Sequence, residues 1–194
     1  GDGSFLYSAP IDTCGKYTID PVPHNRSYFI SQLRAVSNYF SSVSYNNFGI
    51  DMDNSMVFPA TEENSYVLSN EMNYYHPFNE DEIHDERITE LFRDAVQTAY
   101  SVDSINFSLY DHIVIFHAGI GQDFSLPFLD PTPEDIPSTF IDQDMLDMHV
   151  GGPLEFPNAI IHQGMVLPET QNHLFFEESE NIFLNAEEPC DYQY

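Results

Sequence analysis

The chain has 194 residues, 42% of them hydrophobic and 14% aromatic, which is enough to bury one core, so we expect a single domain or domain fragment. Five Lys and Arg residues against 32 Asp and Glu residues give a formal net charge of -27. This charge excludes the basic surface of a nucleic-acid-binding protein and opposes binding to anionic membranes, so cations, calcium among them, are the expected partners.

An extended arm is expected over residues 1–24, because Pro10, Pro21 and Pro23 interrupt it and no hydrophobic period is sustained there. Residues 26–43 predict a helix, with Asn25 or Ser27 available as N-cap. Its apolar side chains share one helical face, which predicts a helix packed on the core. They are Phe29, Leu33, Val36, Phe40 and Val43.

Short apolar runs at residues 48–52 and 56–58 predict a pair of strands, or one strand and a loop. Between them, Asp51, Asp53 and Ser55 have the spacing that opens a calcium-binding loop. Met56 stands where that loop needs glycine, and no glutamate occupies its twelfth position. A solvated turn is therefore expected.

A second helix is predicted at about residues 80–99. Asn79 and Glu82 have the spacing of a capping box, and acidic residues 80–82 suit the positive end of the helix dipole. The apolar residues that follow keep helical spacing. They are Ile88, Leu91, Phe92, Ala95, Val96 and Ala99.

The stretch YDHIVIFHAGIGQD, residues 110–123, predicts a strand. Its continuous apolar run, rich in β-branched residues and ended by Ala118 and Gly119, is typical of a strand buried on both faces. A helix that leads into a strand, twice along the chain, indicates an α/β fold with a mixed, twisted sheet packed by the two main helices. Further strands are predicted within residues 140–146 and 158–167, before an acidic tail over residues 170–194.

The chain has eight histidines but no His-Glu-x-x-His motif, which would place two imidazoles and a carboxylate around one zinc ion. His112 and His117 are five residues apart on a predicted strand, so they point to opposite faces and cannot readily share a metal. Cys14 and Cys190 could close a disulfide in a chain whose low Lys and abundant Asn, Ser and Tyr content is typical of secreted proteins.

Four segments in succession carry a resemblance to a known family. They are LRAVSNYFSSVSYNNFGID, ERITELFRDAV, INFSLYDHIVIFHAGIGQD and GMVLPET. This order resembles the first part of the catalytic domain of immune inhibitor A-type zinc metallopeptidases, over about residues 26–169. The family's landmarks fall on Tyr39, Phe40 and Ser44, and on the turn from His117 to Asp123.

The resemblance implies a zincin-like core at residues 25–169. In that family the zinc-binding His-Glu-x-x-His helix follows the segment similar to GMVLPET, and no such helix is in this sequence. We therefore expect the non-catalytic N-terminal part of a secreted zinc metalloendopeptidase, a processed or excised piece that is inactive and binds no zinc by itself.

His117, Gly119, Gly121, Gln122 and Asp123 are the candidate cleft residues. His117 precedes two glycines that permit tight turns, so a loop-fixing role is favoured over metal ligation. Gln122 and Asp123 could cap a turn or help hold a cation. In zincins a sheet edge receives the substrate peptide by strand addition, and residues 140–146 and 158–166 are the candidates for that edge.

Two other functions stay open at this point. An acidic extracellular structural or adhesive domain could keep a peptidase-like scaffold without catalysis, because fold does not fix function. A half domain would also leave apolar faces uncovered, which predicts a complementing chain or an oligomer.

Overall fold

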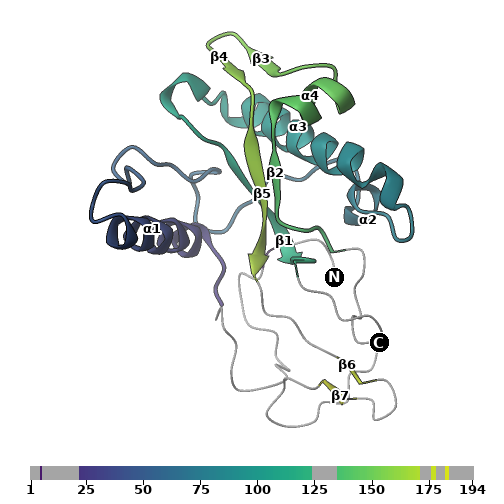
Figure 1. Cartoon of the computed structure of the whole chain (residues 1–194), viewed down its shortest axis with the longest axis horizontal. Helices are drawn as coiled ribbons and strands as arrows, with labels where there is room; N and C mark the ends of the chain where they lie inside the picture. Colours follow the sequence, from purple (N-terminus) through teal and green to yellow (C-terminus); the bar gives the residue numbers. More distant parts are fainter. Residues whose placement is uncertain (1–4, 6–21, 124–134, 171–175, 178–181, 184–194) are drawn as a thin grey trace.

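The computed structural model describes residue 5 and residues 22–123, 135–170, 176–177 and 182–183 (Figure 1). Cys14 and Cys190, most of the expected arm and nearly all of the acidic tail lie outside these residues. The elements are α1 (Arg26–Val43), α2 (Met72–Tyr75), η1 (Asp81–Ile83), α3 (His84–Asp103), η2 (Phe107–Leu109), β1 (Val114–Ile120), β2 (Thr139–Ile141), α4 (Gln143–His149), β3 (Leu154–Phe156), β4 (Ala159–Ile161), β5 (Gly164–Thr170), β6 (Phe176–Glu177) and β7 (Ile182–Phe183).

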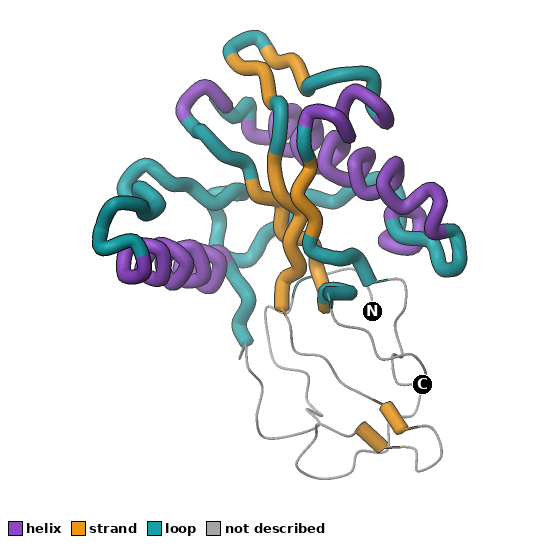
Figure 2. Tube along the Cα trace, viewed as in Figure 1, coloured by secondary structure: helices purple, strands orange, loops and turns teal. Residues whose placement is uncertain are grey.

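A mixed sheet with strand order β1-β5-β2 forms the centre of the fold (Figure 2). Strand β1 is parallel to β5, and β2 is antiparallel to it. The α/β class is therefore confirmed. The expectation that β1 is buried on both faces is wrong, because six of its seven residues are only half-buried. Strand β5 is the central strand.

Helix α3 covers one face of this sheet and builds the core with it. Phe92 is fully buried, as are Val166 of β5 and Ile141 of β2. The predicted second helix is confirmed, but it begins at His84 after a 3-10 turn. The capping box is wrong, since Asn79 has a left-handed φ of 59° and the N-cap, Ile83, makes no side-chain hydrogen bond.

Helix α1 begins and ends as predicted, and Asn25 is its N-cap, accepting from the Tyr28 N–H at 3.1 Å. The expectation of a core-facing helix is wrong. Phe29 packs on Phe116 of β1 with ring centroids 4.7 Å apart and Leu33 is half-buried, whereas the other three residues of the apolar stripe are exposed. Val36, Phe40 and Val43 expose 43%, 40% and 55% of their surfaces.

Two of the weaker strand predictions also need correction. Residues 48–58 form turns and no strand, and the Asp51 carboxylate accepts the N–H groups of Asp53 and Asn54, so the expected solvated turn is confirmed. Residues 140–146 contain the end of β2 and then α4, whose first turn is capped by Asp142 through the Met145 N–H at 2.9 Å.

Residues 158–167 form two strands, β4 and the first part of β5. Strand β4 pairs with β3 in a hairpin, and β5 joins the central sheet. No helix among the described residues is long and apolar enough to cross a bilayer.

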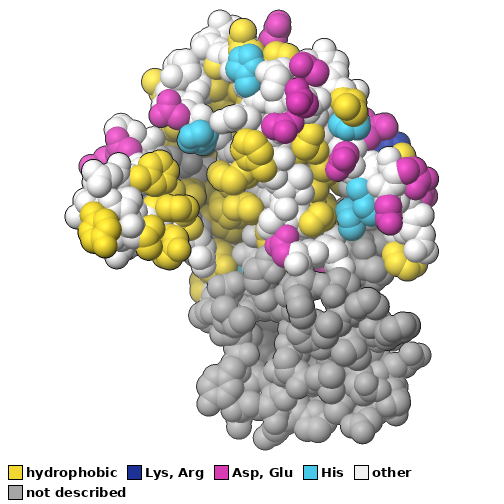
Figure 3. Space-filling view, in the orientation of Figure 1, with side chains coloured by type: hydrophobic (Ala, Val, Ile, Leu, Met, Phe, Trp, Pro, Cys, Tyr) yellow, Lys and Arg dark blue, Asp and Glu magenta, His cyan; other side chains and the backbone are white. Residues whose placement is uncertain are grey.

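The described part of the chain covers the second face of the sheet only partly. Side chains that alternate along a strand point to opposite faces, so Met165 and Leu167 of β5 point away from α3, as does Phe140 opposite Met165. Met165 and Leu167 are half-buried, and Phe140 is 55% exposed. Hydrophobic side chains gather on this side over both the sheet and α1 (Figure 3).

Gly164 sets how closely α3 approaches the sheet. A Cβ atom there would lie 2.3 Å and 2.4 Å from the Phe92 ring and 2.9 Å from the Ile113 carbonyl oxygen. We expect Gly164→Ala to lower the free energy of unfolding by about 1–3 kcal/mol through overpacking, measured by urea denaturation. Phe92→Leu removes part of the obstructing ring, so the double variant should lose less than the sum of the single losses. Strict additivity would contradict this account.

Candidate functional site

The candidate cleft residues span the end of β1 and the turn that follows it, where the backbone requires glycine. Gly119 has a φ of 91°, in the region that favours glycine. A Cβ atom at Gly121 would lie 2.7 Å from Cγ of Pro168, so only glycine lets this loop pass so close to β5. The glycines therefore fold the loop back along the end of β5.

His117 is 7% exposed, and both of its ring nitrogens face carbonyl oxygens. Nδ1 lies 3.0 Å from the oxygen of Ala118, and Nε2 lies 3.1 Å from the oxygen of Ile136. A neutral imidazole can donate to one of them and an imidazolium to both. Burial lowers the pKa of the His117 imidazole below its ordinary value, and the hydrogen bonds and nearby carboxylates oppose that shift.

Gln122 and Asp123 bind the segment that leads into β2. The Gln122 N–H donates to the Ile136 oxygen at 3.3 Å, so that carbonyl is shared with His117. Asp123 accepts from the N–H and the hydroxyl of Ser138, each at 2.6 Å. Ser138 directly precedes β2, so the loop after β1 fixes the start of that strand.

Glu169, near the end of β5, was not among the predicted site residues, yet it is the best-connected polar side chain of this region. One carboxylate oxygen accepts from His24 Nδ1 at 2.7 Å, and the other accepts from the Gly119 N–H at 2.9 Å. The side chains of His24 and Glu169 are both fully buried. We call this arrangement the Glu169 clamp.

The clamp also fixes the start of α1. The Tyr28 hydroxyl donates to the Glu169 carbonyl oxygen at 3.0 Å, and the Tyr28 ring stacks on His24 with centroids 4.3 Å apart. A lone carboxylate that closes an apolar strand is a usable sequence signal for Glu169. No local signal identifies His24, which is 145 residues away from it in the chain.

These groups are arranged to hold structure rather than to react. Both oxygens of Glu169 accept hydrogen bonds within the protein, and its imidazole partner is buried. No group of three His, Cys, Asp or Glu side chains among the described residues could hold a metal ion. His112, in contrast to His117, is exposed and lies outside β1. The site therefore positions the β1 loop, the start of β2 and α1.

A second pair of histidines packs between α2 and α3. The rings of His76 and His84 have centroids 4.0 Å apart, and His84 Nε2 contacts the Pro77 oxygen at 2.8 Å. Nδ1 of His76 is buried without a hydrogen-bond partner. Burial, and then the neighbouring His84, lower the pKa of His76. The two histidines lie between α2 and α3 and are not part of the candidate cleft.

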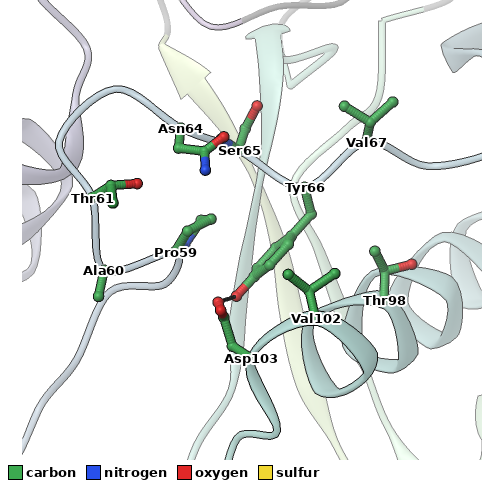
Figure 4. A pocket seen from close by; sticks show the side chains of 10 residues that line it. All are labelled: Pro59, Ala60, Thr61, Asn64, Ser65, Tyr66, Val67, Thr98, Val102 and Asp103. Atoms are coloured by element: carbon green, nitrogen blue, oxygen red, sulfur yellow. Dashed lines mark hydrogen bonds between the residues drawn. The ribbon is translucent and has the colours of Figure 1, made fainter.

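A pocket of about 300 Å³ lies between residues 59–67 and the end of α3 (Figure 4). The Tyr66 hydroxyl points across it and donates to the Asp103 carboxylate. Burial and this hydrogen bond raise the pKa of Tyr66. The lining contains no histidine or cysteine, and its one carboxylate is already bonded to Tyr66, so the pocket offers no acid-base pair.

Comparisons with known proteins did not identify a family for this chain. No protein-family model matches the chain, and no curated protein or solved structure matches it.

Removal of the Glu169 clamp should destabilise the fold. Glu169→Ala leaves His24 Nδ1 and the Gly119 N–H buried without this acceptor, so we expect a loss of about 3–5 kcal/mol in urea denaturation. Glu155→Ala is the control, because Glu155 is an exposed glutamate on β3, and it should change stability by less than about 0.5 kcal/mol. Equal effects of the two substitutions would show that the clamp contributes nothing.

The lowered pKa of His117 predicts a pH-dependent contribution. The unfolded chain binds a proton at this histidine more readily than the folded chain, so the contribution is complete above the ordinary pKa of about 6.5 and is lost as pH falls through the lowered folded value. His117→Gln should therefore cost more stability at pH 7.5 than at pH 5.5, by urea denaturation. His112→Gln, at an exposed site, should change stability by less than about 0.5 kcal/mol at pH 7.5. A larger His117→Gln cost at the lower pH would refute the assignment.

Proposed function

We propose that this chain is the non-catalytic N-terminal part of a secreted zinc metalloendopeptidase-like protein. In this proposal it forms the scaffold and the substrate-edge side of a peptide-binding cleft, and the zinc-binding residues belong to sequence outside this chain. The resemblance to immune inhibitor A-type peptidases motivates the proposal, and calcium is its expected structural ion. The support in the fold comes from the free edge of β2.

The hydrogen-bond direction along β5 identifies the groups at that edge. The Met165 N–H donates to the Ile113 oxygen at 3.0 Å, so the backbone of Met165 points toward β1. Successive residues of a strand point their N–H and C=O groups to opposite sides, so Gly164 and Val166 point toward β2. Phe140, opposite Met165, therefore directs its own N–H and C=O away from the sheet. No strand among the described residues pairs with this side of β2. The outward donor and acceptor of Phe140 are the observation that carries the proposal.

An edge strand with an outward donor and acceptor can bind an extended peptide as an additional strand. Of the two segments expected to supply that edge, residues 140–146 contain the end of β2. Residues 158–166 contain β4, which belongs to the separate β3-β4 hairpin, and the start of β5, which lies between two strands of the central sheet. The contacts of His117, Gln122 and Asp123 hold the start of β2 from the β1 side. The cleft-loop residues thus support the edge that would receive the peptide.

The open apolar face gives a second line of support. Phe140, Met165 and Leu167 on the sheet, and Val36 and Phe40 on α1, remain exposed or half-buried. Exposed apolar surface of this kind is typical of a core that another element completes. The missing catalytic helix of the family is one such element, and a complementing chain or a second copy is another.

Proline substitutions in β2 test the edge. We expect wild-type protein to bind a fluorescein-labelled heptapeptide with leucine at its centre and glutamine two residues to either side, measured by fluorescence anisotropy. Phe140→Pro removes the outward N–H and should weaken binding about 3- to 10-fold, the effect of one hydrogen bond, with only a small loss of stability. Phe140→Ala removes the same ring but keeps the N–H. Comparison of the two variants therefore separates the effect of the lost side chain on binding from the effect of the lost N–H.

The matched control is Thr139→Pro. Thr139 pairs with Val166, so its N–H points into the sheet, and its loss should lower the free energy of unfolding by about 1–3 kcal/mol. Absence of peptide binding by the wild-type protein would overturn the proposal and favour the acidic structural or adhesive domain. Chelator-sensitive cleavage of casein by this chain would contradict the placement of the zinc ligands outside it.

A further inference from the structure

Carboxylates lie at both ends of the free edge of β2. At the end where β2 begins, Asp123 is bonded to Ser138 and is itself exposed. At the other end, Asp142 directly follows β2 and Asp144 lies exposed in the first turn of α4. The strand itself is only three residues long, so any peptide that pairs with it extends past both ends.

Lys and Arg side chains are absent from this half of the protein, since no Lys or Arg follows Arg93 in the sequence. The two arginines of α3 are already paired. Arg87 contacts Glu90 at 2.5 Å, and Arg93 contacts Asp94 at 2.8 Å. In a chain of net charge -27, the carboxylates around β2 therefore favour a cationic ligand.

We infer that the β2 edge selects an extended cationic peptide, with an apolar residue opposite Phe140 and a lysine or arginine two residues to either side of it. This inference rests on the proposed function and adds the class of peptide that the edge receives. The occupant is a peptide strand, because the free groups of Phe140 are backbone groups that only another backbone satisfies in this pattern.

The spacing follows from antiparallel pairing. One peptide residue exchanges both hydrogen bonds with Phe140, and its side chain lies on the same face of the sheet as the Phe140 ring, which is 55% exposed. Peptide residues two positions away are about 7 Å further along the strand on that same face. Since β2 has only one residue on either side of Phe140, these positions lie beyond its ends, where the carboxylates are.

The test compares three labelled heptapeptides with leucine at the centre and lysine, glutamine or glutamate two residues to either side. In anisotropy titrations at low salt, the lysine peptide should bind about 3- to 10-fold more tightly than the glutamine peptide, as expected for two exposed ion pairs, and the glutamate peptide should bind most weakly. The lysine advantage should shrink in about 0.5 M NaCl, which screens exposed charges.

A charge variant locates the effect. Asp144→Asn should reduce the lysine advantage by about twofold, while binding of the glutamine peptide stays unchanged. Glu63→Gln makes the same change of charge at an exposed residue of the loop after α1, and should leave the advantage intact. Equal loss in both variants would show that total charge, rather than the β2 edge, attracts the peptide and would overturn the inference.

The outcomes separate the two proposals. Binding of all three peptides with equal affinity, sensitive to Phe140→Pro, would refute the cationic selection and leave the peptide edge standing. Binding of the lysine peptide alone, insensitive to Phe140→Pro, would refute pairing at β2. Absence of binding by every peptide would refute the peptide edge and the cationic selection together.

Discussion

The hydrogen bonds on both sides of β5 are the constraint on which the rest of the fold depends. A residue of a strand directs its two backbone groups to one side, and the next residue directs them to the other. With Met165 bonded toward β1, Gly164 and Val166 direct their backbone groups toward β2, and the side-chain alternation along the strand sends Val166 into the core under α3. A shift of one residue would exchange the buried and open faces of β5.

The polar end of β5 fixes the position of this strand relative to distant parts of the chain. Glu169 joins residues from before α1, from α1 itself and from the end of β1, while the opposite end of β5 is fixed by the lack of space at Gly164. An apolar contact tolerates sliding, whereas a buried carboxylate with two fixed donors does not, so the clamp favours one arrangement of these segments over others.

Local patterns in the sequence predicted the helices well and their partners poorly. The spacing of Phe29 to Val43 identified α1, including its Asn25 cap, because a helix forms from contacts between residues three and four apart. The same spacing says only that one face is apolar. It cannot say whether this protein covers that face, and Phe40 is 40% exposed. The start of α3 was missed because Asn79 adopts a left-handed conformation, which no spacing rule detects.

The candidate site shows the same division between local and long-range information. The glycine-punctuated turn after His117 was recognisable, since its residues are consecutive. The pairing of His24 with Glu169 was not, because it depends on which strand lies between which others. The sequence pattern also overestimated the burial of β1. A run of β-branched residues is equally compatible with an edge strand that has one exposed apolar face.

The two surfaces that the described residues leave uncovered would select partners by different physics. The open apolar face favours any apolar element of suitable shape, because hydrophobic burial is not directional. The β2 edge is directional, since its one outward donor and acceptor must meet a backbone in a single register, and the carboxylates beside it add a preference for positive charge. Burial on the first surface can therefore complete the fold without specifying a sequence, whereas recognition of a particular peptide has to come from the second.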